Sequence, residues 1–493
     1  MSSILALDQG TTGSTALVIH QDGTVLGRGY REIAQHFPEP GWVEHDPEEL
    51  FASTITAAHQ AIASAGEQPT AVGITNQRET VVVWERDTLR PVHRAVVWQD
   101  RRTAARCQEL RGQGRENGIR ERTGLLLDPY FSATKLEWLL RDDRLRQRAT
   151  AGELCAGTVD SWIVARLTGG CHVTDHTNAS RTMLYALDSM AWDPELLALF
   201  GVPREVLPEV VSSCGVVGEC GREHFGAPLS IAGIAGDQQA ALFGQGCTVP
   251  GSAKNTYGTG AFLLVQAGAK RPEPGAGLLT TIACGPLGEP HYALEGSVFI
   301  AGAAIQWLRD GLGLLESAAE SEALARSVSD TGGVSFVPAF VGLGSPHWEA
   351  NARGTITGLT RGSTRAHLVR AALESMAFAT HELLTAMLAG PGLRVRALRV
   401  DGGASANNWL MQFQADILGL PVERPALVET TALGAALLAG IATGVWSSPE
   451  SLLGAIVWDR FEPHLGESDR ERLLAGWARA VRSALCWARE AEV

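Results

Sequence analysis

The stretch that decides the fold is ILALDQGTTGSTALVI, residues 4–19, in which two apolar runs flank a short polar island. The runs are typical of buried strands, and the island holds Asp8 beside residues with small side chains. The N–H groups of such a loop and the hydroxyls of Thr11 and Thr12 can donate to phosphate oxygens, while Asp8 can hold a metal ion that the phosphates carry. An ordinary acidic turn is the alternative interpretation, since the chain has no Walker lysine here.

The pattern continues outward as a meander followed by a helix. Asp22-Gly23 is typical of a hairpin turn, so we expect three consecutive strands. The next stretch, HDPEELFASTITAAHQAIASAG, predicts a helix with Asp46 as N-cap, Pro47 at the first position and Gly66 as the stop. Strands are then predicted in AVGITNQ and TVVVWER.

The second half of the chain repeats this pattern. KNTYGTGAFLLVQAG, residues 254–268, is again a polar Gly/Thr turn that leads into an apolar strand. VRALRVDGGASANN predicts a strand, a loop at Gly402-Gly403 and a helix from about Ser405, a junction that lets a ligand approach the backbone. The sequence therefore predicts an α/β fold of two similar halves, residues 1–248 and 249–493, with a nucleotide held between the two turns.

Composition excludes several classes of protein. The chain has 493 residues, 45% hydrophobic and 19% charged, and a net charge of −13, which argues against a nucleic-acid partner. The start lacks the pattern of a signal peptide, and the eight scattered cysteines predict reduced thiols, so we expect a cytoplasmic protein. Residues 430–449 carry no charge, but Ala, Gly, Thr and Ser dominate them; a buried helix is expected, and no membrane insertion.

Several polar and aromatic residues are candidates for chemistry. Asp237 follows the apolar strand of SIAGIAGDQQ and opens a helix, where it could accept a proton from an attacking hydroxyl or act only as a helix cap. Arg78 and Glu79, at a strand end, could bind two hydroxyls or form a surface ion pair. Trp98 and Tyr130 could contact a small polyol or pack in the core.

Several long strings of the sequence resemble those of the FGGY carbohydrate kinase family, within the actin-like ATPase superfamily. The resemblance covers essentially the whole chain, and it rests on strings such as PGWVEHDP, GITNQRET, TDHTNASRTML, GIAGDQQAALFGQ, AKNTYGTG and LRVDGGASANN, with GTITGLTRGSTRAHLVRAALE as the C-terminal signature. GITNQRET together with GIAGDQQ points, within the family, to the members that phosphorylate glycerol. The resemblance implies two actin-like (ribonuclease H-like) domains with a catalytic cleft between them.

The resemblance also implies the reaction and the residues that carry it out. The expected reaction is the transfer of a phosphoryl group from ATP, with Mg²⁺, to glycerol to give sn-glycerol 3-phosphate, with Asp237 as the base. The glycerol pocket would be formed by Arg78, Glu79, Trp98, Tyr130, Asp237, Gln238 and Phe262. The nucleotide would be bound by Thr11, Thr12, Ser14, Thr15, Thr259, Gly302, Gln306, Gly403 and Asn407, with Asp8 as the metal residue. A homodimer or homotetramer is implied as well.

Two departures from better-known relatives bear on ADP binding and on regulation. Thr15 stands where many have an arginine, so we expect weaker retention of ADP. The segment VGECGREHFGAP, residues 217–228, lacks the basic glycine-rich loop that binds fructose bisphosphate, and inhibition by that sugar is not expected. His224 in this segment faintly resembles a phosphorylated histidine of some relatives, but an exposed loop histidine is the favoured interpretation.

Two other functions stay open. A related kinase that acts on a pentulose or another polyol would share the fold and the ATP site, and the Arg78, Glu79, Trp98 and Tyr130 set favours glycerol over it. An ATP-driven binding protein, as in the chaperone and filament branches of the superfamily, would hydrolyse ATP without an acceptor and would have no use for Asp237.

Overall fold

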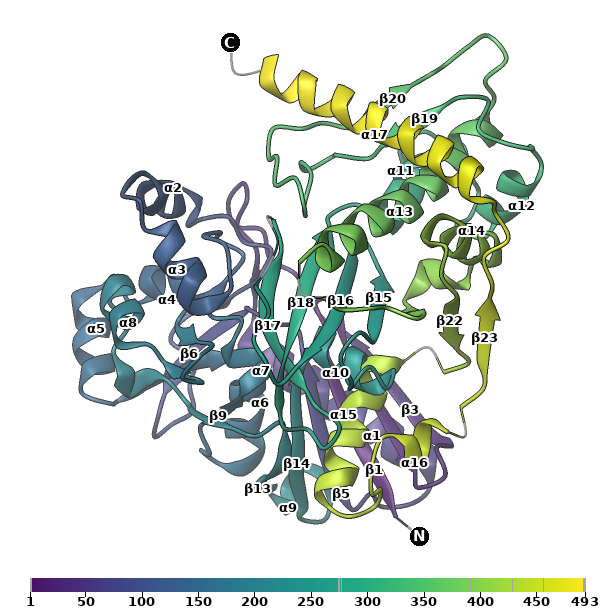
Figure 1. Ribbon diagram of the computed structural model, residues 1–493. Helices are drawn as coiled ribbons and strands as arrows, with labels where there is room; N and C mark the ends of the chain where they lie inside the picture. Colours follow the sequence, from purple (N-terminus) through teal and green to yellow (C-terminus); the bar gives the residue numbers. More distant parts are fainter. Residues whose placement is uncertain are drawn as a thin grey trace.

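The computed structural model describes residues 2–490, except residues 274, 276, 391, 428 and 455. Two mixed β-sheets form the centres of two α/β halves, with helices on their faces (Figure 1). The N-terminal half includes an outlying group of short helices around a small sheet, seen at the left of Figure 1. The predicted mixed α/β architecture is therefore confirmed.

The first sheet has six strands in the order β13-β14-β5-β1-β2-β3. Its strands are β1 Ser3–Gln9, β2 Gly13–His20, β3 Val25–Glu32, β5 Ala71–Asn76, β13 Cys214–Cys220 and β14 Leu229–Gly236. Strands β1, β2 and β3 are the predicted antiparallel meander. Strands β5 and β14 extend the sheet parallel to β1, so the carboxyl ends of these three strands meet at one edge.

The second sheet has seven strands in the order β17-β18-β16-β15-β21-β22-β23. Its strands are β15 Ala253–Tyr257, β16 Ala261–Gly268, β17 Leu279–Cys284, β18 Pro290–Val298, β21 Leu398–Asp401, β22 Val422–Pro425 and β23 Trp458–Phe461. Strands β15, β16 and β18 are antiparallel neighbours, and β21 and β22 run parallel to β15. This repeats the pairing of β1, β2, β3, β5 and β14, which confirms the expected similarity of the two halves.

Helix α1, Pro47–Ala65, covers one face of the first sheet, against β2 and β3. It forms as the sequence predicts. The Asp46 side chain accepts a hydrogen bond from the Glu48 N–H at 2.9 Å, Pro47 occupies the first helical position, and Gly66 ends the helix with φ +68°.

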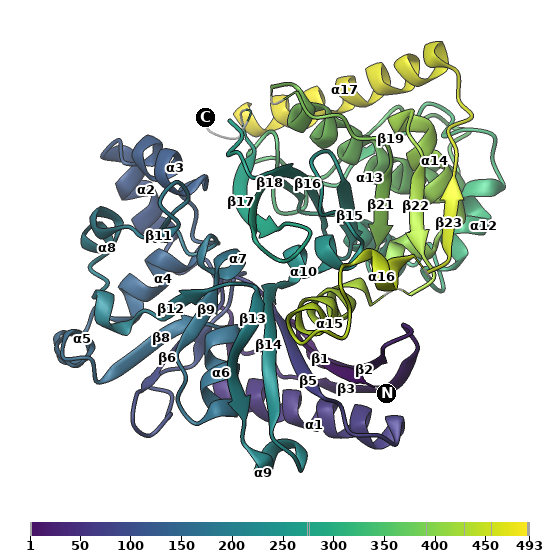
Figure 2. The same cartoon turned by 60° about the horizontal axis from the view of Figure 1, so that its bottom comes forward.

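Two helices join the halves. Helices α10, Asp237–Gly244, and α15, Thr430–Ala442, pack on each other between the sheets, and α15 also covers β1, β5 and β14 (Figure 2). The packing is close because the side chains are small: a Cβ on Gly434 would lie 1.9 Å from the Ala240 carbonyl oxygen. The uncharged stretch is thus a buried helix, as predicted, and within the described residues no helix has the length and apolar character that crossing a bilayer requires.

The remaining elements complete the two halves. The short strands are β4 Glu44–His45, β6 Val81–Glu85, β7 Ala95–Val96, β8 Leu154–Thr158, β9 Val173–Asp175, β10 Tyr185–Ala186, β11 Ala191–Trp192, β12 Glu209–Val211, β19 Ser335–Val337 and β20 Thr355–Thr357. The helices of the N-terminal half are α2 Ala104–Gly112, α3 Glu116–Thr123, α4 Ser132–Leu139, α5 Asp143–Thr150, α6 Val159–Thr168, α7 His176–Ala179, α8 Pro194–Phe200, η1 Arg204–Val206 and α9 Arg222–Phe225. Those of the C-terminal half are α11 Gly302–Asp310, α12 Glu320–Arg326, α13 Arg365–Leu388, η2 Gly403–Ala406, α14 Asn408–Leu418, α16 Glu450–Leu453 and α17 Glu467–Glu490.

One predicted boundary is shifted. The helix after the Gly402-Gly403 loop was expected from about Ser405, but residues 403–406 form the 3₁₀ turn η2 and α14 begins at Asn408. The reason is the cap: the Asn407 side chain accepts a hydrogen bond from the Leu410 N–H at 2.9 Å, so Asn407 starts the helix.

Candidate active site between the two halves

Three site residues come together because three parallel strands end at one edge of the first sheet. Gln9 of β1, Asn76 of β5 and Gly236 of β14 share one level of the register. Asp8, Arg78 and Asp237 lie within two residues of these positions and meet where the two sheets face each other. Ligand sites in α/β sheets commonly form at such carboxyl ends.

The predicted phosphate loop is the tight turn between β1 and β2. The Gly10 N–H donates to the Gly13 carbonyl at 3.0 Å, and Ile33 in turn donates to the Thr12 carbonyl at 3.0 Å. The Thr11 hydroxyl accepts a hydrogen bond from the indole N–H of Trp98 at 2.9 Å, and Thr12 is exposed. The loop thus presents a threonine hydroxyl and small residues next to a candidate pocket aromatic.

Strand alternation separates Thr15 from Ser14. Thr15 pairs with Asp8 across β1 and β2, so both side chains lie on the same face of the sheet. Ser14 points to the opposite face, where its hydroxyl lies 2.8 Å from the Ser53 hydroxyl and 3.3 Å from that of Thr54, both on α1. Ser14 was expected to line the phosphates; its hydroxyl is committed to α1 instead, because successive side chains of a strand alternate between faces.

Asp8 and Asp237 form an acidic pair at the junction. Asp237 opens α10, its Oδ1 accepts a hydrogen bond from the Gln238 N–H at 2.7 Å, and its side chain is 31% exposed. The pKa of Asp8 is raised to about 7, first by burial and second by the negative charge of Asp237. A divalent cation at Asp8 would offset both effects, and carboxylate oxygens are the ligands that Mg²⁺ prefers. The residues therefore fit the expected metal.

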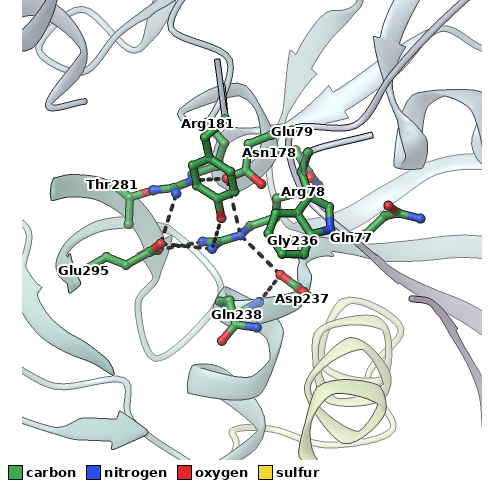
Figure 3. A network of polar contacts seen from close by, with 12 residues as sticks. Gln77, Arg78, Glu79, Asn178, Arg181, Gly236, Asp237, Gln238, Thr281 and Glu295 are labelled. Atoms are coloured by element: carbon green, nitrogen blue, oxygen red, sulfur yellow. Dashed lines mark hydrogen bonds and ion pairs between the residues drawn. The ribbon is translucent and has the colours of Figure 1, made fainter. Parts of the chain in front are cut away.

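Arg78 is buried at the centre of the site, not at the surface, and both of its terminal nitrogens donate to acceptors (Figure 3). Its Nη1 donates to Glu295 Oε2 at 2.6 Å and to Gln239 Oε1 at 3.2 Å. Its Nη2 donates to Glu295 Oε1 at 3.0 Å and lies 3.5 Å from the Tyr130 hydroxyl. Its Nε lies 3.2 Å from Asp237 Oδ1. A substrate hydroxyl that binds a terminal nitrogen of Arg78 must therefore share or replace one of its hydrogen bonds, and the long one to Tyr130 is the weakest.

Glu79 sits in a strained turn. Its φ is +60°, and the Thr80 N–H donates to the Arg78 carbonyl at 2.7 Å, which closes a three-residue turn around Glu79. The Glu79 carbonyl accepts hydrogen bonds from the Ser132 hydroxyl at 3.1 Å and from the Lys135 ammonium at 3.4 Å. These two buried donors at α4 hold the turn, which aims the Glu79 carboxylate into the pocket beside Arg78.

Arg181 and Glu295 belong to the site, although the sequence assigned them no role. The Arg181 Nε donates to Glu79 Oε1 at 2.7 Å, and its Nη2 donates to Glu295 Oε1 at 3.0 Å. Burial alone would raise the pKa of Glu295, but the positive charges of Arg181 and Arg78 outweigh burial and hold it at about 2. The position of Glu295 inside the apolar strand YALEGSV was a signal in the sequence that could have identified it as a site residue. No comparable signal distinguished Arg181 from other arginines.

The remaining pocket candidates lie around this core. The rings of Trp98 and Tyr130 meet edge to face, with centroids 5.7 Å apart. Phe262 of β16 lies on the sheet face that also carries Glu295, because β16 and β18 pair Leu264 with Glu295 and Phe262 is two residues from Leu264.

Gln238 follows Asp237 and is held from the other half. Its Oε1 accepts a hydrogen bond from the ammonium of Lys254, a buried residue of β15 that also donates to the Thr256 hydroxyl at 2.7 Å. The contact therefore joins α10 to the second sheet.

The predicted nucleotide side is built from backbone. The Ala301 N–H donates to the Thr259 carbonyl at 2.8 Å and the Gly302 N–H to the Gly258 carbonyl at 3.0 Å, so the β15–β16 turn and the start of α11 are joined. A Cβ on Gly302 would lie only 2.6 Å from the Gly258 oxygen. Gln306, one turn further along α11, is exposed.

The loop after β21 completes this side. Gly402 has φ +84°, and a Cβ on it would lie 2.3 Å from the Tyr257 carbonyl oxygen, whereas a Cβ on Gly403 would meet no atom within 4 Å. Asn407 caps α14 with its oxygen, and its amide nitrogen donates to the Ser321 hydroxyl at 3.3 Å. Thr259, Gly302 and Gly403 thus lie on adjoining turns, while the Asn407 side chain is already engaged.

Comparison with known proteins identifies the family of the chain. Models of the N-terminal and C-terminal domains of the FGGY family of carbohydrate kinases match residues 3–244 and 253–443. The chain is 56% identical to a glycerol kinase of Carboxydothermus hydrogenoformans, over 98% of each chain, and 54% identical to glycerol kinase 2 of Thermotoga maritima, over 99% of each. The crystal structure of Plasmodium falciparum glycerol kinase with ADP has a TM-score of 0.93 at 35% identity and covers 98% of each chain. The chain belongs to the FGGY family of carbohydrate kinases.

Proposed function

We propose that this kinase transfers the terminal phosphoryl group of ATP to glycerol and forms sn-glycerol 3-phosphate and ADP. Full-length relatives named glycerol kinase support this substrate. The observation that carries the proposal is the position of Asp237, whose partly exposed carboxylate lies 3.2 Å from the buried Arg78 guanidinium at the edge that also bears the phosphate loop. A base, a hydroxyl-binding fork and a phosphate-binding turn therefore share one small space.

The reaction follows from these positions. Asp237 accepts the proton of a terminal hydroxyl while that oxygen attacks the terminal phosphorus in line, and the bond to the bridging oxygen breaks as ADP leaves. Arg78 and Glu79 bind the other hydroxyls as donor and acceptor, with Tyr130 and Gln238 beside them. Trp98 and Phe262 cover the C–H side of the substrate. Because the transition state is loose, positioning contributes more than the strength of the base.

On the donor side we propose that the triphosphate lies between the two Gly/Thr turns. Thr11, Thr12 and Thr15 would face its phosphates, and the C-terminal half would contribute Thr259, Gly302, Gln306, Gly403 and Asn407. Asp8 would hold Mg²⁺, which neutralises charge on the phosphates. Ser14 is left out of this set, since its hydroxyl is bonded to α1.

Several broader expectations concern the whole protein and not its site. We propose residues 1–248 and 249–493 as the two domains, with the qualification that α15 of the second packs on the sheet of the first. A homodimer or homotetramer is expected, which light scattering can test. We assign the reaction to the cytoplasm and to glycerol uptake and catabolism; the free thiols of the cysteines between residues 107 and 284 suit a reducing compartment.

A coupled assay for ADP tests the proposal. We expect MgATP turnover to rise at least about 100-fold when glycerol is added, because water alone is a poor acceptor in a site built for an alcohol. Equal ADP formation with and without glycerol would favour an ATP-driven binding protein. Faster turnover with D-xylulose or another polyol than with glycerol would favour a different carbohydrate kinase.

A further inference from the structure

Glu295 lies on the C-terminal half but contacts the glycerol pocket of the N-terminal half. It is in the middle of β18, where it pairs with Leu264 of β16 and Leu279 of β17, and its side chain is 1% exposed. An isolated carboxylate at such a position would be costly to bury, so its partners must account for its presence.

Both oxygens of Glu295 bind arginines of the other half (Figure 3). Oε2 accepts from Arg78 Nη1 at 2.6 Å and Oε1 from Arg78 Nη2 at 3.0 Å, which is a two-point fork. Oε1 also accepts from Arg181 Nη2 at 3.0 Å. Arg181 in turn binds Glu79, so two arginines and two glutamates form a buried cluster of opposite charges.

The fork decides where Arg78 points. Among the residues that the structure describes, its other acidic contact at comparable distance is Asp237, 3.2 Å from Nε, while Glu79 lies 3.7 Å away. If Glu295 lost its charge, Asp237 would become the main partner of Arg78. The guanidinium would then turn toward the base, bind the carboxylate more tightly and move away from the position where it can meet a substrate hydroxyl.

We propose that Glu295 is a positioning residue of the acceptor pocket, supplied by the C-terminal half, which holds the Arg78 fork in place and keeps it from closing on Asp237. The inference rests on the proposed phosphorylation of glycerol. It also means that the acceptor pocket is complete only when the two halves are together, although every residue expected to touch the hydroxyls belongs to the first half.

The variant Glu295→Gln keeps the size of the side chain and removes its charge. We expect the KM for glycerol to rise about 30-fold and kcat to fall about 10-fold, while the KM for MgATP changes less than about 3-fold, because the lost fork acts on the acceptor side alone. The matched control is Glu374→Gln, another buried glutamate of the C-terminal half, which accepts from Arg370 at 2.9 Å on α13. Its kinetic constants should stay within about 2-fold of the wild type.

A crystal structure of Glu295→Gln tests the inference without any activity, and it should show Arg78 turned toward Asp237. If that variant does not fold, Glu295→Asp keeps the charge on a shorter side chain, and its KM for glycerol should rise about 3- to 10-fold with an unchanged KM for MgATP.

An unmoved Arg78, or equal changes in the KM values for both substrates, would overturn the inference. A wild-type protein without glycerol-dependent turnover would instead contradict the proposed function. The position of Arg78 in the crystal structure of Glu295→Gln would still decide whether Glu295 positions Arg78.

Discussion

The two sides of the site are built from different materials. On the acceptor side, buried charged side chains hold one another: Arg78 and Arg181 are 3% and 0% exposed, and their acidic partners Glu79 and Glu295 are 1% exposed each. On the nucleotide side, backbone turns meet at Gly302 and Gly402, and the nearby side chains of Thr259 and Gln306 are exposed. The difference suits the two ligands: a small neutral polyol needs fixed donors and acceptors, whereas a nucleotide brings its own charges and needs room for its backbone contacts.

The largest effect is expected from Arg181→Met, which removes the hydrogen bonds of Arg181 to Glu79 and Glu295 on the acceptor side and leaves the nucleotide side intact. Without Arg181 a buried glutamate loses its closest cation, so we expect kcat/KM for glycerol to fall about 1,000-fold and the free energy of unfolding to fall about 3 kcal/mol. Steady-state kinetics and urea unfolding measure both.

The control for Arg181→Met is Arg370→Met, which breaks the ion pair to Glu374 on α13. It should lower stability without changing the KM for glycerol. If the two variants affect glycerol kinetics equally, the cluster has no special role on the acceptor side.

Gly302→Val should disrupt the nucleotide side of the site and leave the acceptor side intact. Its Cβ would lie 2.6 Å from the Gly258 oxygen, so the β15–β16 turn must move away from the start of α11. We expect the KM for MgATP to rise about 30-fold. Glycerol affinity measured by calorimetry without nucleotide should change less than about 2-fold, since the acceptor cluster is not touched. Loss of glycerol binding in this variant would show that the structure of the acceptor side depends on that of the nucleotide side.

Lys254 of the second sheet contacts Gln238 of α10, and the burial of Lys254 can be tested through the pH dependence of stability. Burial lowers its pKa to about 8, against about 10.5 for lysine in an unfolded chain. Between these values the unfolded chain binds a proton that the folded chain lacks, so Lys254 makes the folded protein more stable as pH rises through this window. The stability of Lys254→Met relative to the wild type should therefore fall by about 2 kcal/mol from pH 7 to pH 10.

Urea unfolding at the two pH values measures this difference, with Lys270→Met, at an exposed lysine, as the control. A stability difference between Lys254→Met and the wild type that does not depend on pH would contradict the lowered pKa of Lys254.

The smallest effect is expected from Thr15→Arg, which adds a charge to the phosphate loop. Thr15 lies opposite Asp8 on the face toward the junction, so we expect ADP to bind about 5-fold more tightly. Ser14→Ala is the matched control, because its hydroxyl faces α1, and it should leave the ADP dissociation constant unchanged. An unchanged constant in Thr15→Arg would mean that the missing arginine does not weaken ADP retention.

Local sequence patterns predicted what local physics determines. The meander around Asp8, the caps of α1 and the strand-to-helix junction at Asp237 all follow from patterns within about ten residues. The same period-two rule shows that Ser14 and Thr15 cannot both face the phosphates, although the resemblance named both. The contact between Arg78 and Glu295 could not be predicted from the sequence, because the two residues are 217 positions apart and only the strand pairing of the second sheet brings Glu295 to Arg78.

The resemblance supplied the residues that touch the ligands but not those that hold them. Arg181 lies in a recognisable string, TNASRTML, yet its role depends on a cluster closed by two other segments of the chain. Such long-range ion pairs leave no periodic signal in a single sequence.

The most direct test of the account is the turnover of Asp237→Asn with glycerol and MgATP. The amide keeps the shape of the side chain but cannot take up the proton, so we predict that kcat falls at least about 100-fold while the calorimetric dissociation constant for glycerol changes less than about 5-fold. Turnover near the wild-type rate would contradict the central claim that Asp237 receives the proton of the attacking hydroxyl.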